Sequence, residues 1–147
     1  MIRDYTPKDF DEVLRIFDEN VPQYFALDER ADLIHYLNNG LDEYHLVELD
    51  GEIVAAGGIN YFVDSLDSAR LSWDFVSVEY HGKGIGGKLI QFQIDRLKKN
   101  SKIKQIIVRT SQHAYGFYQK NGFQLEKIEK DYWAEGFDLY LMEINNW

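Results

Sequence analysis

The spacing of apolar residues predicts two helices near the N-terminus, after a short strand at Ile2 to Tyr5. Thr6 is a suitable N-cap, and Pro7 is favoured at a first helical position. The following apolar residues recur at helical intervals, which places one face of this helix on a core. These residues are Phe10, Val13, Leu14, Phe17 and Val21. A second helix is expected from about Asp28 to Gly40, where Asn-Asn-Gly is a typical C-terminal signal.

The next apolar segments predict a hairpin followed by a third strand. Tyr44 to Leu49 and Glu52 to Tyr61 flank Asp50-Gly51, which suits a two-residue turn because both central positions need positive φ. Gly57-Gly58 predicts a bulge or a close approach by another part of the chain. The third strand is expected from Ala69 to Val78.

The C-terminal half alternates helices and strands. A helix is expected to follow a glycine-rich turn and to end near Lys99, and Ile106 to Val108 then reads as a buried strand. Because a helix separates this strand from the preceding one, the two should be parallel and form a right-handed βαβ unit. Ser111 is expected to cap a helix through about Asn121.

Two final strands are expected at Phe123 to Lys130 and Phe137 to Ile144. The last is apolar on both faces, which predicts an interior position in the sheet. The whole order is β-α-α-β-β-β-α-β-α-β-β, which predicts an α/β (α+β) fold with about seven strands in a mixed sheet and about four helices on both faces. At 147 residues and 45% hydrophobic, the chain is expected to form a single domain over residues 1–147.

Composition narrows the classes of function. The net charge of -9 argues against a general nucleic-acid binder, and no apolar run is long enough to predict a membrane span. The absence of cysteine excludes disulfides, thiolate nucleophiles and cysteine-based zinc sites. Four scattered histidines lack metal-ligand spacing, so no metal is expected. The expected location is the cytoplasm, and the expected assembly is a monomer or a homodimer.

The charge is unevenly distributed, which indicates a local anion site. Between His81 and Arg109 the chain carries eight basic residues against Asp95 alone. The basic residues are Lys83, Lys88, Arg96, Lys98, Lys99, Lys102, Lys104 and Arg109. A solvated basic helix face would give the same count, so this feature needs a second signal.

That second signal is the glycine-rich turn at residues 81–88, although it fits more than one phosphate-binding pattern. Gly82, Gly84 and Gly87 match the dinucleotide motif, but the following strand ends in Arg109-Thr110 rather than in an acidic residue. The same segment matches a P-loop except that Leu89 replaces the hydroxyl residue that would hold magnesium.

All of these patterns share one physical arrangement. Glycines let the backbone bend at a strand end, and free N–H groups at the start of the next helix face an anion such as a pyrophosphate. Lys83 and Lys88 add positive charge, and His81 can donate a hydrogen bond. The alternative is a plain glycine-rich turn.

Two segments resemble one known family. Val76 to Gly86 is similar to the acyl-CoA motif of the GNAT acetyltransferases, whose core is Arg/Gln-x-x-Gly-x-Gly/Ala, with His81 in place of the Arg or Gln. Ala114 to Phe123 is similar to the family's later motif and retains its Phe-Tyr-x-Lys-x-Gly-Phe core. Ser111 stands where the family often has Asn before this helix.

The resemblance implies a GNAT-like fold and an N-acetyltransferase that moves an acetyl group from acetyl-CoA to a primary amine by direct attack on the thioester. The acceptor is expected to be a small molecule, a lysine or an N-terminal amine. The residues that the resemblance assigns to acetyl-CoA are Val76, Ser77, Val78, His81, Gly82, Lys83, Gly84, Ile85, Gly86, Gly87, Lys88, Ser111 and Tyr115. Three alternatives stay open: a non-catalytic acyl-CoA-binding module, an enzyme for another acyl-CoA, and a nucleotide binder.

Acyl transfer to an amine needs a neutral nucleophile, a stabilised oxyanion and a proton for the leaving thiolate. The resemblance makes Tyr118 the candidate general acid, since a phenol can protonate a developing thiolate. Asp74, in the otherwise apolar stretch Trp73 to Val76, is the candidate general base. It can equally anchor a cationic substrate or lie on an exposed strand face, and Tyr118 can simply pack.

The acceptor pocket is expected to be aromatic. Its candidate residues are Tyr24 and Phe25 between the first helices, Trp73, and Tyr132-Trp133 in the last loop. The surrounding acidic residues favour a cationic acceptor. They are Asp28, Glu29, Asp131, Glu135 and Asp138.

Overall fold

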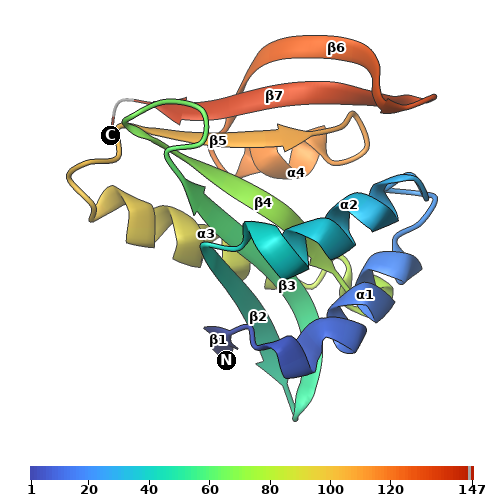
Figure 1. Cartoon of the computed structure of the whole chain (residues 1–147). Coiled ribbons are helices and arrows are strands. Elements are labelled where there is room, and N and C mark those ends of the chain that lie inside the picture. The colour runs from blue at the N-terminus through green and yellow to red at the C-terminus, as the bar shows by residue number, and fades with distance from the viewer. Residues whose placement is uncertain (146) are drawn as a thin grey trace.

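Seven strands form one mixed sheet in the order β1-β2-β3-β4-β5-β7-β6, in a computed structural model that describes residues 1–145 and 147 (Figure 1). The strands are β1 (Ile2–Asp4), β2 (Glu43–Leu49), β3 (Glu52–Tyr61), β4 (Ser68–Val76), β5 (Gln105–Thr110), β6 (Gln124–Ala134) and β7 (Phe137–Asn145). The α-helices in the described residues are α1 (Phe10–Glu19), α2 (Glu29–His35), α3 (Ile85–Lys98) and α4 (Tyr115–Lys120). Short helical turns add Pro7–Asp9, Tyr36–Gly40 and Val78–Tyr80. The predicted element order is confirmed, and β7 lies inside the sheet as expected.

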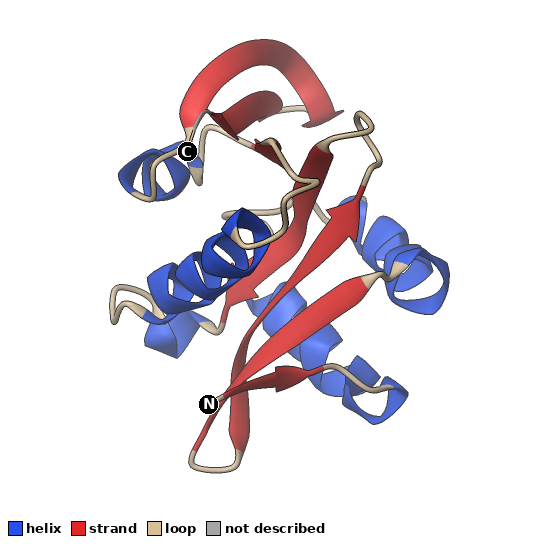
Figure 2. Ribbon diagram, turned by 90° about the vertical axis from the view of Figure 1, so that its left-hand side faces the viewer, coloured by secondary structure: helices blue, strands red, loops and turns tan. Residues whose placement is uncertain are grey.

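The helices cover both faces of the sheet (Figure 2). α1 and α2 pack on one face of β2 to β4, in a core that includes Phe17, Leu33 and Leu46. α3 and α4 pack on the other face, where Ile94 and Tyr118 belong to a second core. The apolar periodicity of the sequence therefore selected the correct buried faces.

The β4–β5 pair is the parallel pair of this sheet, and its ladder is short. It runs from Ser68 opposite Gln105 to Leu71 opposite Val108. Beyond Leu71, β4 pairs only with β3. From this point β4 and β5 diverge toward their C-terminal ends (Figure 1). This divergence opens the sheet between the first four strands and the last three.

A bulge in β3 and β4 directs two side chains at the open end to opposite faces. The register between these strands shifts between Ala56 and Gly58, opposite Trp73, whose φ is 54°. Trp73 packs against the face of α1 and α2, whereas Asp74 reaches Tyr118 on the face of α4. A Cβ at Gly57 would lie 2.0 Å from Asp74 Oδ1, so only glycine leaves room for this carboxyl group. The bulge and the close approach predicted at Gly57-Gly58 are both present.

The bounds of α1 and β4 differ from the expected ones. α1 ends at Glu19, so Val21 lies beyond the helix although it still packs against the same core. β4 ends at Val76 because Val78–Tyr80 forms a tight helical turn.

The C-terminal bounds also need correction. α4 begins at Tyr115 and not at Ser111, whose hydroxyl instead accepts the His113 N–H in the preceding turn. Tyr132 and Trp133 lie in β6 rather than in a loop, because β6 continues to Ala134 past a break in register. Propensity could not place these ends, since long-range pairing extends one element and local hydrogen bonds shorten the other.

Candidate functional site

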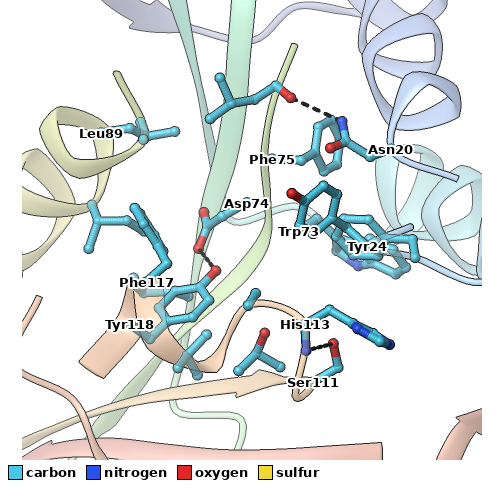
Figure 3. A pocket seen from close by; sticks show the side chains of 18 of the residues that line it. Asn20, Tyr24, Trp73, Asp74, Phe75, Leu89, Ser111, His113, Phe117 and Tyr118 are labelled. Atoms are coloured by element: carbon cyan, nitrogen blue, oxygen red, sulfur yellow. Dashed lines mark hydrogen bonds between the residues drawn. The ribbon is translucent and has the colours of Figure 1, made fainter. Parts of the chain in front are cut away.

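A cavity of about 630 Å³ lies where β4 and β5 diverge (Figure 3). It is lined by the end of β4, the glycine turn, α3, the end of β5, α4 and the loop between α1 and α2. The sequence-predicted site residues that line it are Tyr24, Phe25, Trp73, Asp74, Val76, His81, Gly82, Gly84, Ile85, Gly86, Gly87, Ser111, Tyr118 and Trp133. The topology thus joins segments that lie far apart in the sequence.

Six of the predicted site residues do not line this cavity: Ser77, Val78, Lys83, Lys88, Tyr115 and Tyr132. Lys83 lies 5.2 Å from the centre of the Tyr80 ring, and Lys88 is exposed on α3. Tyr115 packs against Tyr140 and accepts a hydrogen bond from Gln119. These residues lie outside the cavity lining because each occupies a face of its helix or turn that points elsewhere.

The glycine turn forms a backbone cradle at the start of α3. Gly82 and Gly84 have φ values of 75° and 81°, which a residue with a side chain rarely adopts. The first helical hydrogen bond runs from the Lys88 N–H to the Gly84 carbonyl, so the N–H groups before Lys88 have no partner within the helix. A Cβ at Gly86 would lie 3.2 Å from Phe117, so glycine keeps the passage between α3 and α4 open. The cradle suits an anion.

Val76 supplies the strand end that faces the open side of the sheet. The Ser77 N–H bonds to Val54 of β3, so by the alternation of an antiparallel ladder the N–H and carbonyl of Val76 point away from β3. The Val76 carbonyl accepts hydrogen bonds from Asn20 Nδ2 at 3.0 Å and His81 Nε2 at 2.8 Å. The Val76 N–H is consequently the backbone donor that this strand end aims at the cavity.

The two residues after Val76 are held by α1. Glu19 Oε1 accepts the Ser77 hydroxyl at 2.8 Å and the Val78 N–H at 3.0 Å. This carboxylate fixes the direction in which the chain leaves β4. It also accepts the Val78 N–H, and the Ser77 N–H is bound to Val54, so of these three residues only Val76 has a backbone N–H without a hydrogen-bond partner in the described chain.

His81 connects the glycine turn to the loop after α1. Because the partner of Nε2 is the Val76 carbonyl, Nε2 carries the hydrogen and donates it. The imidazole lies edge-on to the Tyr24 ring, with 5.3 Å between ring centres. His81 therefore braces the strand end, and its Nε2 is engaged within the protein.

Asp74 and Tyr118 meet inside the cavity wall (Figure 3). The Tyr118 hydroxyl donates to Asp74 Oδ2 at 3.3 Å, while Asp74 Oδ1 is buried without a hydrogen-bond partner in the described residues. Burial raises the pKa of Asp74 well above its ordinary range, and burial together with Asp74 raises the pKa of Tyr118. The neighbouring Gln93 side chain is also buried and lacks a partner in the described chain. The raised pKa favours the protonated form of Asp74.

Glu29 provides the second carboxyl group of the cavity lining, besides that of Asp74. It begins α2, is 6% exposed, and accepts the Ala26 N–H at 2.8 Å through Oε2. Burial raises its pKa to about 7, a value that lets it gain or lose a proton near neutral pH. The sequence marked Glu29 only as one of several acidic residues, because nothing local reveals its burial.

Aromatic side chains form the wall beside Glu29. Phe25 stacks on Trp73 with 6.2 Å between ring centres, and the Tyr44 hydroxyl donates to the Trp73 carbonyl at 2.8 Å. Across the opening, the Trp133 indole N–H donates to the Thr110 carbonyl at 3.1 Å. Both walls are held in place by hydrogen bonds or packing within the protein.

The sequence as a whole matches a family model described as an acetyltransferase (GNAT) domain, over residues 3–146. This chain belongs to the GNAT acetyltransferase family. An N-alpha-acetyltransferase of Sulfurisphaera tokodaii is 28% identical to this chain. The match covers 96% of this chain and 90% of that protein. The family resemblance seen in the two sequence motifs is therefore confirmed.

Solved structures share the fold of this GNAT domain. Ard1 from Thermoplasma volcanium matches with a TM-score of 0.82 at 19% identity, covering 100% of this chain and 97% of that one. A GNAT family acetyltransferase from Elizabethkingia anophelis with acetyl-CoA bound matches at 0.73 and 21% identity, covering 99% of this chain and 97% of that one. At these identities the likeness shows a common fold.

Two further features of the GNAT domain bear on the site. The described residues hold no group of three or more histidine or acidic side chains placed to bind a metal ion. No helix in the same residues combines the length and apolar character needed to cross a membrane. Sequence reasoning missed Asn20 and Glu19, whose polar contacts arise only when distant elements pack, and it missed the buried Gln93.

Proposed function

We propose that this protein is an N-acetyltransferase that uses acetyl-CoA to acylate a primary amine. The observation that carries the proposal is the divergence of β4 from β5, which connects the glycine cradle of α3 to Tyr118 and Glu29 through one cavity. The relatives named N-alpha-acetyltransferase support an N-terminal amine as one acceptor class. A small-molecule amine or a lysine side chain would use the same chemistry.

The donor side of the cavity fits acetyl-CoA. The open N–H groups at the start of α3 suit its pyrophosphate, and Gly86 leaves space that a side chain would fill. When bound, acetyl-CoA would supply the thioester that the amine attacks. The Val76 N–H faces this space and is the group that we assign to the thioester oxygen, where it would stabilise the developing negative charge.

Tyr118 is assigned to protonate the departing sulfur. Its hydroxyl lies at the cavity wall, and its hydrogen bond to Asp74 fixes its orientation. Protonation of the sulfur leaves a tyrosinate, and a protonated Asp74 can pass its proton to that oxygen, so the negative charge moves to the Asp74 carboxylate, which regains a proton from solvent before the next turnover. We therefore assign Asp74 to proton transfer toward the leaving sulfur, and not to the role of general base that its sequence context suggested.

Glu29 is assigned to the amine side. A carboxylate with a pKa of about 7 can hold the incoming ammonium and accept its proton near neutral pH. Glu29 lies with Tyr24, Phe25 and Trp73 in the part of the cavity lining that we assign to the acceptor and call the acceptor half.

Following thiol release from acetyl-CoA with a panel of amines and peptides tests this function. We expect release that depends on the acceptor, and a drop of about a hundredfold in kcat/KM for Glu29→Gln. Asp28→Asn, at an exposed neighbouring carboxylate, is the matched control. Acetyl-CoA binding without thiol release from any acceptor would indicate a binding module, and faster release from another acyl-CoA would change the donor.

A further inference from the structure

Arg109 places a positive charge in the acceptor half of the cavity. It lies near the end of β5 and lines the cavity. Its neighbour Val108 points into the core under α3 and α4, so by the alternation of a strand the Arg109 side chain lies on the opposite face, that of α1 and α2. This is the face that carries Trp73 and Phe25.

The Arg109 guanidinium is held in place by two aromatic rings. Its central carbon lies 5.2 Å from the centre of the Tyr132 ring and 5.3 Å from that of Trp133. One N–H donates to the Tyr132 hydroxyl, and the Trp133 indole is fixed by its bond to Thr110. A guanidinium held on aromatic faces loses little conformational freedom when it binds a ligand.

No acidic side chain in the described part of the chain neutralises Arg109. Arg70, which also lines the cavity, is held by Asp64 through bonds of 2.6 and 3.1 Å. Arg109 has no carboxylate within ion-pair distance among these residues.

Two acidic residues of the nearby β6–β7 hairpin accept hydrogen bonds from the backbone of the hairpin itself. Asp138 Oδ1 accepts the Asp131 N–H at 2.9 Å, and Asp131 Oδ1 accepts the Gly136 N–H at 2.8 Å. One of the five guanidinium donors of Arg109 is used by Tyr132, so several remain for a planar anion.

The two walls of the acceptor half therefore carry opposite charges. Glu29 comes from the start of α2, and Arg109 comes from the end of β5. We propose that the acceptor is a zwitterion whose amine is bound by Glu29 and whose carboxylate is bound by Arg109. This inference rests on the proposed function and narrows its acceptor from any amine to an amino-acid-like one. A free amino acid and a peptide N-terminus followed by an acidic residue share this chemistry.

Matched acceptors with and without the carboxylate test the proposal. Phenylalanine is compared with phenethylamine, and a peptide beginning Ala-Asp with one beginning Ala-Asn. We expect the wild type to favour the member that carries the carboxylate by tenfold or more in kcat/KM, in at least one pair. The pair that shows this preference tells whether the acceptor is a free amino acid or a peptide N-terminus. Arg109→Gln should abolish that preference, leave the neutral acceptor within about twofold, and leave the KM for acetyl-CoA unchanged.

Two further variants separate charge from structure. Arg109→Lys keeps the charge without the planar fork and should retain part of the preference. Arg30→Gln removes a charge outside the cavity and should retain all of it. Equal rates for both members of each pair would overturn the proposal while acceptor-dependent thiol release still supported the acetyltransferase. Equal losses on both acceptors in Arg109→Gln, or a raised KM for acetyl-CoA, would also overturn it, and no thiol release at all would overturn both.

Discussion

Tyr118 and Asp74 form a buried pair in which each side chain influences the protonation of the other. The Tyr118 hydroxyl is the one hydrogen-bond donor that Asp74 has within ordinary distance in the described residues. Because burial disfavours the charged form of both groups, it raises the pKa of Asp74 and the pKa of Tyr118. A raised pKa makes Tyr118 a weaker acid, so its proton is transferred only as negative charge develops on a leaving sulfur beside it.

Tyr118→Phe should lower kcat by about a hundredfold and leave the KM for acetyl-CoA within about twofold, because the variant loses the proton donor and keeps the ring. It should also reduce the free energy of unfolding by about 1–3 kcal/mol, since Asp74 loses its partner. Steady-state kinetics and urea denaturation measure the two effects. Tyr115→Phe, in the same helix but outside the cavity, is the control, and an unchanged kcat in Tyr118→Phe would remove Tyr118 from the mechanism.

Glu29 should make the protein less stable as the pH rises. Its pKa is raised from an ordinary 4.5 to about 7, so between these values the folded protein binds a proton that the unfolded chain releases. The stability contributed by this group is complete below pH 4.5 and is lost as the pH rises through 7. Because Glu29 lines a cavity, solvent screening reduces the effect of the full pKa shift. The expected loss in the free energy of unfolding is about 2 kcal/mol.

Glu29→Gln keeps the acceptor for the Ala26 N–H and removes the titration. The variant should match the wild type at pH 4.5 and exceed its stability by about 2 kcal/mol at pH 8. Urea denaturation across this range measures the difference between the two proteins. A difference that does not change with pH would show that Glu29 titrates normally in the folded state.

At the scale of elements, the bulge in β3 and β4 depends on a single missing side chain. Gly57→Ala would put a Cβ 2.0 Å from Asp74 Oδ1, so overpacking should cost about 1–3 kcal/mol of stability and displace the carboxyl group from Tyr118. Gly116→Ala, in α4 with no atom within 4 Å of the new Cβ, should instead gain about 0.5 kcal/mol. Denaturation midpoints of the two variants compare them directly, and equal midpoints would contradict the close approach at Gly57.

The elements themselves could be predicted because their causes are local. Helical periodicity placed α1 and α3, Asp50-Gly51 placed the hairpin, and Gly57-Gly58 marked the bulge. The end of β6 could not be predicted, since it depends on pairing with β7 across a break in register.

The candidate site was only partly visible in the sequence for a similar reason. The glycine cradle and Tyr118 belong to contiguous motifs, and both line the cavity. The burial of Glu29 and the aromatic clamp on Arg109 each depend on residues from other elements, so no local pattern reports them. The family resemblance added the order of the motifs but gave no information on the acceptor.

At the scale of the whole molecule, acetyl-CoA should stabilise the domain by filling the opening between β4 and β5. Ligand at about 100 times its Kd adds about 2.7 kcal/mol, which corresponds to a rise of about 10 °C in Tm for a chain of this size. Thermal melting with and without CoA measures this shift. Gly86→Ala should reduce the shift because its Cβ would crowd Phe117 and Val76, whereas Gly116→Ala should preserve it. An undiminished shift in Gly86→Ala would place the ligand elsewhere.

The short β4–β5 ladder also has a consequence for how such a protein can diversify. The glycine cradle is built from one contiguous stretch of chain, whereas the walls that we assign to the acceptor come from the α1–α2 loop and from the C-terminal strands. Substitutions in the acceptor walls therefore need not disturb the cradle or the ladder that holds the sheet together. Exchanging Arg109 and its aromatic neighbours offers a route by which evolution or an engineer could redirect the same scaffold to a different amine.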